Sequence, residues 1–269
     1  MLRAATLTMM VVALASPLYA QSQWLGPSDG RTVWLEMLLP QIDEDEIGFA
    51  TMAGQVGGRF PIGERLAFVA ELPFAHADLD LDESDETGTT AFGNPYVGLE
   101  LGSTGRCTRG ELGARVPLAP DDNAGVVIGL LGDLVDRAEA FAQDAASITV
   151  GASRACPAGE SGWTWRLRGA GSVLIPVDDN EGDTEFQALY GVQAWYQRDY
   201  VIGVGLTGRA FLNPQSGGDL ADRTVHQIGG AMGYDFGAVR PMIEIRVPLD
   251  EDLRDVVPTT IGLGVVVRP

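Results

Sequence analysis

Apolar and polar residues alternate with a period of two along much of this chain. Within residues 66–74 the even positions are apolar, and Glu71 lies among the odd positions. The same alternation recurs in residues 108–118, 163–177 and 239–249. Successive side chains of a β-strand point to opposite faces, so this period predicts strands with one apolar and one polar face.

The alternation predicts about twelve strands, and two kinds of connection alternate between them. The predicted strands are 32–39, 47–60, 65–76, 91–103, 108–118, 146–156, 162–177, 185–197, 200–212, 223–236, 239–249 and 257–268. Short turns at 61–64, 103–106, 157–161, 197–199 and 236–238 alternate with mostly longer, acidic connections at 41–46, 77–89, 177–184, 213–221 and 250–255. An even strand number with short turns on one side is typical of bacterial outer-membrane barrels. We therefore predict an all-β fold, a transmembrane antiparallel β-barrel with short periplasmic turns, long acidic extracellular loops and both termini on the periplasmic side.

A soluble periplasmic β-sandwich that binds a ligand is the alternative fold. Its strands also alternate, because one face meets water and the other meets a second sheet. The order of short and long connections favours the barrel, but the period alone fits both architectures.

One segment departs from the strand pattern. From Leu131 to Asp144 the apolar residues recur at helical spacing, and charged residues take the other faces. This spacing predicts one short amphipathic helix inside a long extracellular connection. Such a helix can fold into the mouth of the barrel or lie over its rim, and a packed loop is the commoner role than a gate.

The first twenty residues have the pattern of a secretory signal peptide. Arg3 gives a basic start, a short apolar stretch follows, and Ala20 precedes polar residues. The apolar stretch is too short to span a bilayer as a helix. We expect residues 1–20 to be the signal peptide and residues 21–269 to form the barrel, in the bacterial outer membrane.

Composition and charge narrow the possible partners. The net charge is −19, and all 18 basic residues are arginines. This acidic balance argues against a nucleic-acid partner. We expect membrane lipid and a small-molecule solute as partners, and the oligomeric state stays open.

The chain has two cysteines, Cys107 and Cys156, and two histidines, His76 and His226. In an exported protein an even cysteine pair favours a disulfide over a metal site. The cysteines flank two consecutive predicted strands at their periplasmic ends, which places them within reach of each other. We expect one disulfide, no metal site and no cofactor.

The most recognisable stretch is Phe92-Gly93-Asn94-Pro95-Tyr96-Val97-Gly98-Leu99-Glu100. It resembles a strand of the outer-membrane proteins of the meta-pathway of phenol degradation, a family of transporters. Residues 57–62, 66–73 and 261–265 also resemble that family. The resemblance implies a barrel channel for uptake of small solutes, including aromatic or apolar compounds. The chain departs from such barrels at its end, Val267-Arg268-Pro269, where an aromatic residue is common.

The polar faces of the predicted strands carry charges of both signs, which would line the lumen. These residues are Glu36, Arg59, Glu71, Glu100, Glu111, Arg115, Arg166, Arg168, Arg209, Glu244 and Arg246. A charge inside a barrel is costly unless it is paired or hydrated. The set therefore predicts either a rigid ladder of ion pairs or a constriction that selects solutes. Arg166 and Arg168 are expected to form a basic stretch, because the flanking strands offer them mainly Ser, Thr and Gln. The sequence does not decide whether the lumen is open or plugged.

A hydrolytic barrel and a structural or adhesive barrel are the rival functions. Catalysis would need a nucleophile, a base and an orienting group. No serine stands beside His76 or His226 in a recognisable motif, so we predict no catalytic residues and no enzyme activity.

Overall fold

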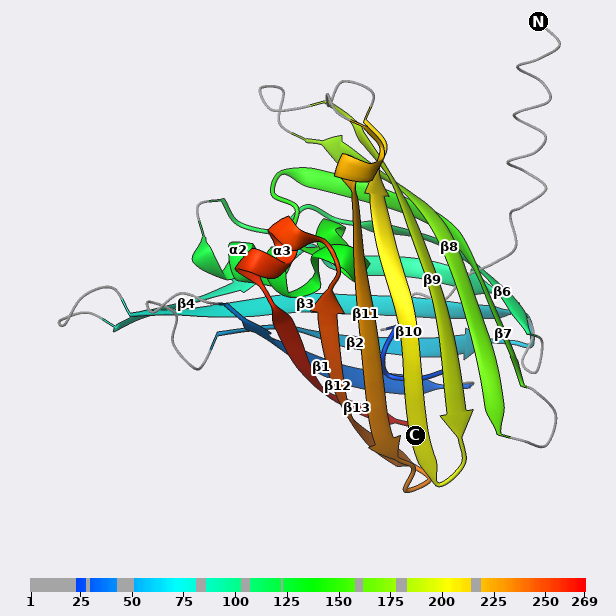
Figure 1. The fold of residues 1–269 in the computed structure, drawn as a ribbon. Coiled ribbons are helices and arrows are strands. Elements are labelled where there is room, and N and C mark those ends of the chain that lie inside the picture. Colours follow the sequence, from blue (N-terminus) through cyan, green and yellow to red (C-terminus); the bar gives the residue numbers. More distant parts are fainter. Residues whose placement is uncertain are drawn as a thin grey trace, which may run out of the picture.

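The strands form one closed antiparallel barrel, seen in a computed structural model of the chain (Figure 1). The structure describes residues 23–27, 30–42, 51–80, 86–102, 107–121, 123–157, 162–177, 183–213 and 219–269. The predicted signal peptide, residues 1–20, lies outside the described residues.

The elements follow one another along the chain, with strands predominating. The strands are β1 (Thr32–Gln41), β2 (Met52–Ile62), β3 (Leu66–Asp80), β4 (Glu86–Phe92), β5 (Tyr96–Leu101), β6 (Thr108–Arg115), β7 (Ala145–Pro157), β8 (Trp163–Pro176), β9 (Glu185–Gln197), β10 (Tyr200–Phe211), β11 (Thr224–Tyr234), β12 (Val239–Pro248) and β13 (Thr259–Val267). The helices are α2 (Ala124–Arg137), η1 (Ala138–Ala140), η3 (Ala221–Arg223) and α3 (Glu251–Val256), where η marks a 3-10 helix.

Strand pairing closes the sheet on itself. β1 pairs with both β2 and β13, β2 pairs with β3, and the remaining strands pair in order around the ring. β4 pairs with residues 74–80 of β3, and β5 pairs with residues 66–71. β4 and β5 are therefore two halves of one barrel strand. The ring therefore has twelve strands, as predicted, and the β-sandwich is excluded.

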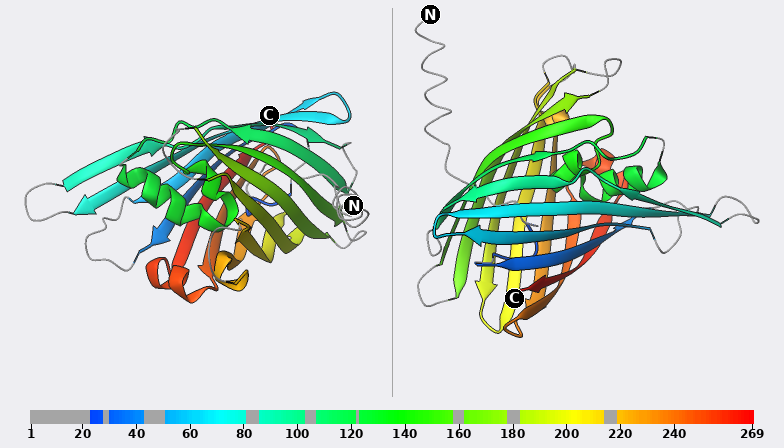
Figure 2. Two further views of the ribbon diagram at one scale, coloured as in Figure 1. Left: turned by 90° about the horizontal axis from the view of Figure 1, so that it is seen from above. Right: turned by 180° about the vertical axis from the view of Figure 1, so that it is seen from behind.

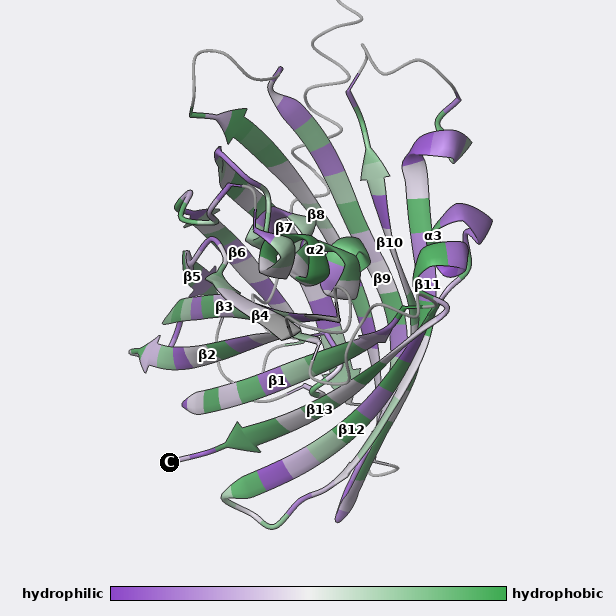
Figure 3. Cartoon of the chain, turned by 90° about the vertical axis from the view of Figure 1, so that its left-hand side faces the viewer, coloured by the Kyte–Doolittle hydropathy of each residue, from purple (hydrophilic) through white to green (hydrophobic). Residues whose placement is uncertain are grey.

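The barrel has its apolar side chains on the outside and its polar side chains on the inside, the reverse of a soluble protein. Side chains that point outward are apolar and exposed, such as Leu167 at 50% exposure, whereas the inward Glu36 has none. The hydropathy stripes across the strands show this alternation (Figure 3). An exposed apolar band around the outside and a polar inside are the arrangement that a bilayer requires of a barrel.

Three boundaries differ from the sequence-based expectation. The stretch 77–89 was predicted as a loop, but β3 runs to Asp80 and β4 begins at Glu86, so this hairpin extends beyond the rest of the barrel (Figure 2). The short helix α3 lies within the connection 250–255, which was predicted as an acidic loop. The predicted strand 108–118 ends at Arg115.

The helix predicted at 131–144 is displaced toward the N-terminus. α2 begins at Ala124, where the side chain of Asn123 accepts a hydrogen bond from the Gly125 amide, 2.8 Å away. It ends at Arg137 and continues as η1. Within the described residues, no helix has the length and apolar character needed to cross a membrane.

Candidate functional site

The helix α2 lies inside the ring of strands, at the end with the long connections (Figure 3). It packs mainly against β1 to β4 and against β10 and β11. Gly132 allows the close approach, because a Cβ at this position would lie 3.1 Å from the Cβ of Ala53 on β2. The lumen that the sequence left undecided is therefore plugged by a helix.

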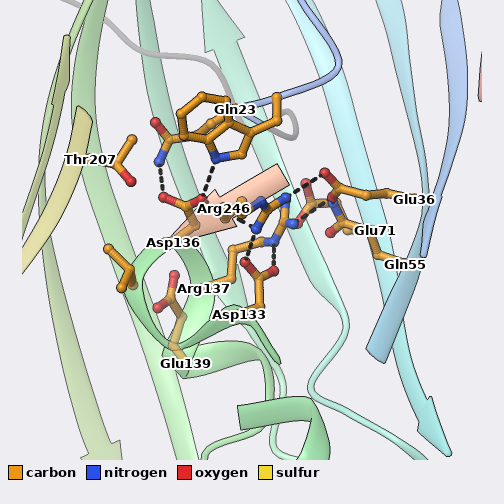
Figure 4. A network of polar contacts seen from close by, with 12 residues as sticks. Gln23, Glu36, Gln55, Glu71, Asp133, Asp136, Arg137, Glu139, Thr207 and Arg246 are labelled. Atoms are coloured by element: carbon orange, nitrogen blue, oxygen red, sulfur yellow. Dashed lines mark hydrogen bonds and ion pairs between the residues drawn. The ribbon is translucent and has the colours of Figure 1, made fainter. Parts of the chain in front are cut away.

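Ion pairs hold α2 to the barrel wall (Figure 4). Arg246 on β12 lies 2.8 Å from Glu36 on β1, and also contacts Asp133 at 2.9 Å and Asp136 at 3.4 Å. Arg137 reaches the other oxygen of Glu36 at 2.5 Å and also pairs with Asp133. The backbone of Asp133 is not helical (φ −139°, ψ 24°), so α2 bends where its charged residues meet the wall.

The segment 23–27 is a second plug. The Gln23 amide donates to Asp136 at 2.8 Å, and the Trp24 indole donates to the same carboxylate at 2.9 Å. The Gln23 carbonyl accepts from Arg166 and Gln193 on the wall, at 3.2 and 3.1 Å. Trp24 is completely buried. The two plugs thus meet each other at Asp136 in the interior of the barrel.

A break in the wall strand anchors the far end of the helical plug. Between β4 and β5, Asn94 donates to the Ala142 carbonyl at 2.6 Å and accepts from the Leu118 and Ala119 amides, at 2.7 and 2.9 Å. Gly93 beside it has no room for a side chain, because a Cβ would lie 2.2 Å from the Ala140 carbonyl oxygen. The Gly-Asn part of the recognisable stretch therefore clamps the connection that carries the plug.

Arg209 on β10 holds the end of the plug from the opposite side. It pairs with Glu139 of η1 at 2.7 Å and donates to the Val135 carbonyl at 3.1 Å. Burial alone would raise the pKa of Glu139, but the positive charges of Arg209 and Arg115 outweigh it and lower this pKa.

A second group of charges lies on β2 to β6. Glu100 forms ion pairs with Arg59 at 2.5 Å and with Arg109 at 3.3 Å. Arg115 pairs with Glu71 at 2.9 Å. Each of these side chains is buried. The wall on this side therefore carries a ladder of ion pairs. Arg109–Glu100 joins neighbouring strands, whereas Arg59–Glu100 and Arg115–Glu71 each reach across one intervening strand.

The structure places ten of the proposed lumen residues in buried positions and the eleventh, Arg168, in a half-buried one. The buried ones are Glu36, Arg59, Glu71, Glu100, Glu111, Arg115, Arg166, Arg209, Glu244 and Arg246. Four of them, Glu36, Arg166, Arg209 and Arg246, contact the plugs directly. Contact of any of them with a solute remains a proposal.

The strands that flank Arg166 and Arg168 place Gln193 and Ser153, respectively, at paired positions, as the sequence indicated. Across the interior, Arg166 lies within electrostatic reach of Glu100, and Arg168 within reach of Glu111. A field set by separate basic and acidic stretches of the wall stays a prediction.

Burial also changes the acidity of the plug. The Asp133 carboxyl is enclosed in the barrel among Asp136 and Glu36, and burial raises its pKa to about 6, although Arg137 and Arg246 lower it. In this part of the cluster the carboxylates outnumber the guanidinium groups, which favours proton uptake.

The plug residues were absent from the sequence-based set of site residues. These are Gln23, Trp24, Asp133, Asp136, Arg137 and Glu139. The only signal for them was a helix with Asp133, Asp136 and Arg137 at spacings of three and four, which places the three on one face. A loop helix with a charged face normally meets water, so the sequence alone did not point inward.

The cysteine pair lies where the sequence predicted it. Cys107 and Cys156 form a disulfide between the start of β6 and the end of β7, with their Cα atoms 4.6 Å apart. Among the described residues, no group of His, Cys, Asp and Glu is arranged to hold a metal ion.

The two histidines lie on the outer wall near the long connections. His226 contacts Asp250, 3.4 Å from its Nδ1, and the ring of Tyr190, 5.9 Å between centroids. His76 contacts the Thr90 hydroxyl at 2.8 Å. These contacts join neighbouring parts of the wall. The barrel fold by itself does not decide whether the chain is an enzyme.

Fold and site together define a β-barrel of the outer-membrane type whose lumen holds a plug, and comparison with solved structures gives the same barrel architecture. The translocator domain of autotransporter NalP from Neisseria meningitidis has a TM-score of 0.53 at 11% identity, covering 100% of this chain and 95% of that one. The NanC porin has a TM-score of 0.52 at 7% identity, covering 89% and 100%. LpxR from Salmonella typhimurium has a TM-score of 0.50 at 11% identity, covering 88% and 99%.

At such identities the likeness establishes the architecture alone. No protein-family model matches the chain, and a search of curated proteins gives no match. The resemblance to the meta-pathway family therefore stays a prediction. The architecture supports a place in the bacterial outer membrane.

Proposed function

We propose that the chain is a gated channel for uptake of small solutes across the bacterial outer membrane, in which α2 and the segment 23–27 close the lumen. One observation carries this proposal: α2 is fixed by charged and polar contacts to the wall. A charge-assisted hydrogen bond has a net worth of about 1.5–3 kcal/mol, and water can replace it when a helix moves. α2 also packs Val126 and Leu130 against an apolar cluster that includes Leu38 and Ala53 of the wall, and water does not replace these contacts.

The wall that α2 leaves uncovered supports a solute path. β7 and β8 turn short polar side chains inward, among them Ser147, Thr149, Ser153 and Ser172. The hydroxyls of Ser147 and Ser153 have no hydrogen-bond partner within the described part of the chain. Their short hydroxyl side chains would offer hydrogen bonds to a polar solute once the plug has moved. The solute class of the predicted family, aromatic or apolar compounds, belongs to this proposal too.

A removable staple tests the proposal. Gly132→Cys with Ala53→Cys would join α2 to β2, because the two Cβ positions lie 3.1 Å apart and a disulfide needs only slightly more. We expect wild-type protein in a planar bilayer to be mostly closed with discrete openings. The oxidised double variant should be silent, and a reducing agent should restore its openings.

The control is wild-type protein with and without the same reducing agent, since the native Cys107–Cys156 disulfide is reduced as well. Two results would contradict the proposal. One is a wild-type protein that never conducts. The other is an oxidised double variant that conducts like the wild type, because solutes would then pass without movement of α2.

A further inference from the structure

A cavity of about 520 Å³ lies at the mouth of the barrel, directly above the plug. This open cavity is lined by residues of α2, of the start of β11 with η3, and of α3. Part of its lining is apolar, with Leu131 from α2, Val225 from β11, and Leu253 and Val256 from α3. This lining would accept the hydrocarbon part of a ligand.

The remainder of the lining is acidic. Asp222, Asp250, Glu251 and Asp252 all border the cavity. Asp250 is held in place by the backbone amide of His226, and Glu251 and Asp252 are exposed in the first turn of α3. The cavity thus combines apolar side chains with a rim of negative charge, and among the described residues no arginine lines it.

A metal ion does not fit this arrangement. The carboxylates belong to no group of three metal-ligating residues that could hold an ion, as far as the described residues go. Charges spread around a rim suit a larger cation that also has an apolar body. We propose that this cavity binds small organic cations, namely an ammonium group joined to an aromatic or aliphatic body.

The cavity is in direct contact with the plug. Leu131 belongs to α2, and Val225 stands opposite Arg209 in the pairing of β10 with β11. Arg209 in turn holds Glu139 and the Val135 carbonyl. A bound cation would therefore touch the plug at Leu131, and it would touch Val225, the strand-pairing partner of the residue that anchors the plug. This inference names the solute class of the proposed channel and in that sense rests on the proposed function.

Three indoles of one shape but different charge test the site. Calorimetric titration of the refolded protein in detergent would compare tryptamine, a cation at pH 7, with neutral tryptophol and with anionic indole-3-acetate. Titration into empty micelles corrects for partition into the detergent. We expect tryptamine to bind about tenfold more tightly than the other two, with the difference shrinking in high salt.

Two double variants, each of which removes two negative charges, test where the site lies. Glu251→Gln with Asp252→Asn should weaken tryptamine binding about fivefold, because two charge contacts of modest strength are lost. Asp121→Asn with Asp183→Asn removes two exposed acids that do not line the cavity, and should leave the affinity within about twofold. Leu253→Ala should weaken tryptamine and tryptophol alike.

Equal affinity for the three indoles would overturn the inference. So would an equal loss in both double variants, because the attraction would then come from the overall negative charge. Binding does not require the lumen to open, so the two proposals fail separately. Tryptamine binding by a protein that never conducts supports this site and refutes the channel. If the disulfide between α2 and β2 controls conductance but the protein shows no preference for tryptamine, this site alone is refuted.

Discussion

At the scale of single residues, Asp136 joins the two plugs. Its carboxylate accepts from Gln23, Trp24 and Gln227 at 2.8 to 2.9 Å and lies 3.4 Å from Arg246. A carboxylate with several buried donors is costly to remove, because each donor left without a partner costs about 1–3 kcal/mol. The seating of both plugs therefore depends on one side chain.

We expect Asp136→Ala to loosen both plugs at once. Hydrogen–deuterium exchange, measured by mass spectrometry, should become faster in residues 23–27 and in 124–137. The strands should keep their protection. Asp183→Asn, which removes an exposed acid elsewhere, is the control and should change neither segment. Faster exchange in α2 alone would mean that the segment 23–27 is held independently of Asp136.

The raised pKa of Asp133 predicts a dependence of gating on pH. Its pKa is about 6 with the helix docked, compared with an ordinary value of 3.8. The docked state therefore binds the proton more tightly, so docking is favoured at low pH and this contribution is lost as pH rises through 6. Open probability in a planar bilayer should rise between pH 5 and pH 7.

Asp133→Asn isolates this group from the others. The amide does not titrate, so the variant should lose most of the pH dependence between pH 5 and pH 7. An unchanged pH profile in Asp133→Asn would assign the effect to another residue.

At the scale of elements, the strands could be predicted because a barrel exposes one face of each strand to lipid and the other to a polar interior. The period of two follows from that requirement and is visible in residues 66–74 without any structure. The helix was placed less well. Gly125, Gly129 and Gly132 dilute the apolar spacing of the helix, although Gly125 and Gly132 let it approach the wall and Gly129 makes room for Phe141.

The break between β4 and β5 could not be predicted from the period. Residues 91–103 read as one strand by their period, although Pro95 has no amide hydrogen for the sheet. In the structure Asn94 contacts the distant Leu118 and Ala142 at this break. The plugs have the same limit, because their partners are far away along the chain: 113 residues separate Gln23 from Asp136, and 74 separate Arg209 from Val135.

Gly93→Ala tests the clamp at that break. The added methyl group would collide with the Ala140 carbonyl, a backbone atom that cannot move by itself. We expect a loss of about 1–3 kcal/mol, typical of overpacking, with faster amide exchange in residues 138–144. Gly169→Ala is the matched control, because nothing lies within 4 Å of its new methyl group. Equal effects of the two substitutions would show that the clamp does not hold the plug.

At the scale of the whole molecule, the outward faces predict how the chain meets a membrane. Leu167 is half exposed on the middle of β8. Leu167→Arg should cost about 2–4 kcal/mol if the residue lies near the bilayer midplane. The expected result is a smaller fraction of protein that migrates as a heat-modifiable band after refolding into lipid vesicles. Leu167→Phe should refold normally, and a normal yield for the arginine variant would contradict the assignment of faces.

The pairing of the first strand with the last sets an order for assembly. β1 meets β13 only after the whole chain has been made, and Leu25 packs against Gly264 beside that seam. A closed ring cannot admit a segment as bulky as Trp24 through its side. The segment 23–27 is therefore in position before the seam closes, or it enters afterwards through an open end of the barrel. The proposed release of α2 uses such an end, so filling of the interior need not precede closure of the wall.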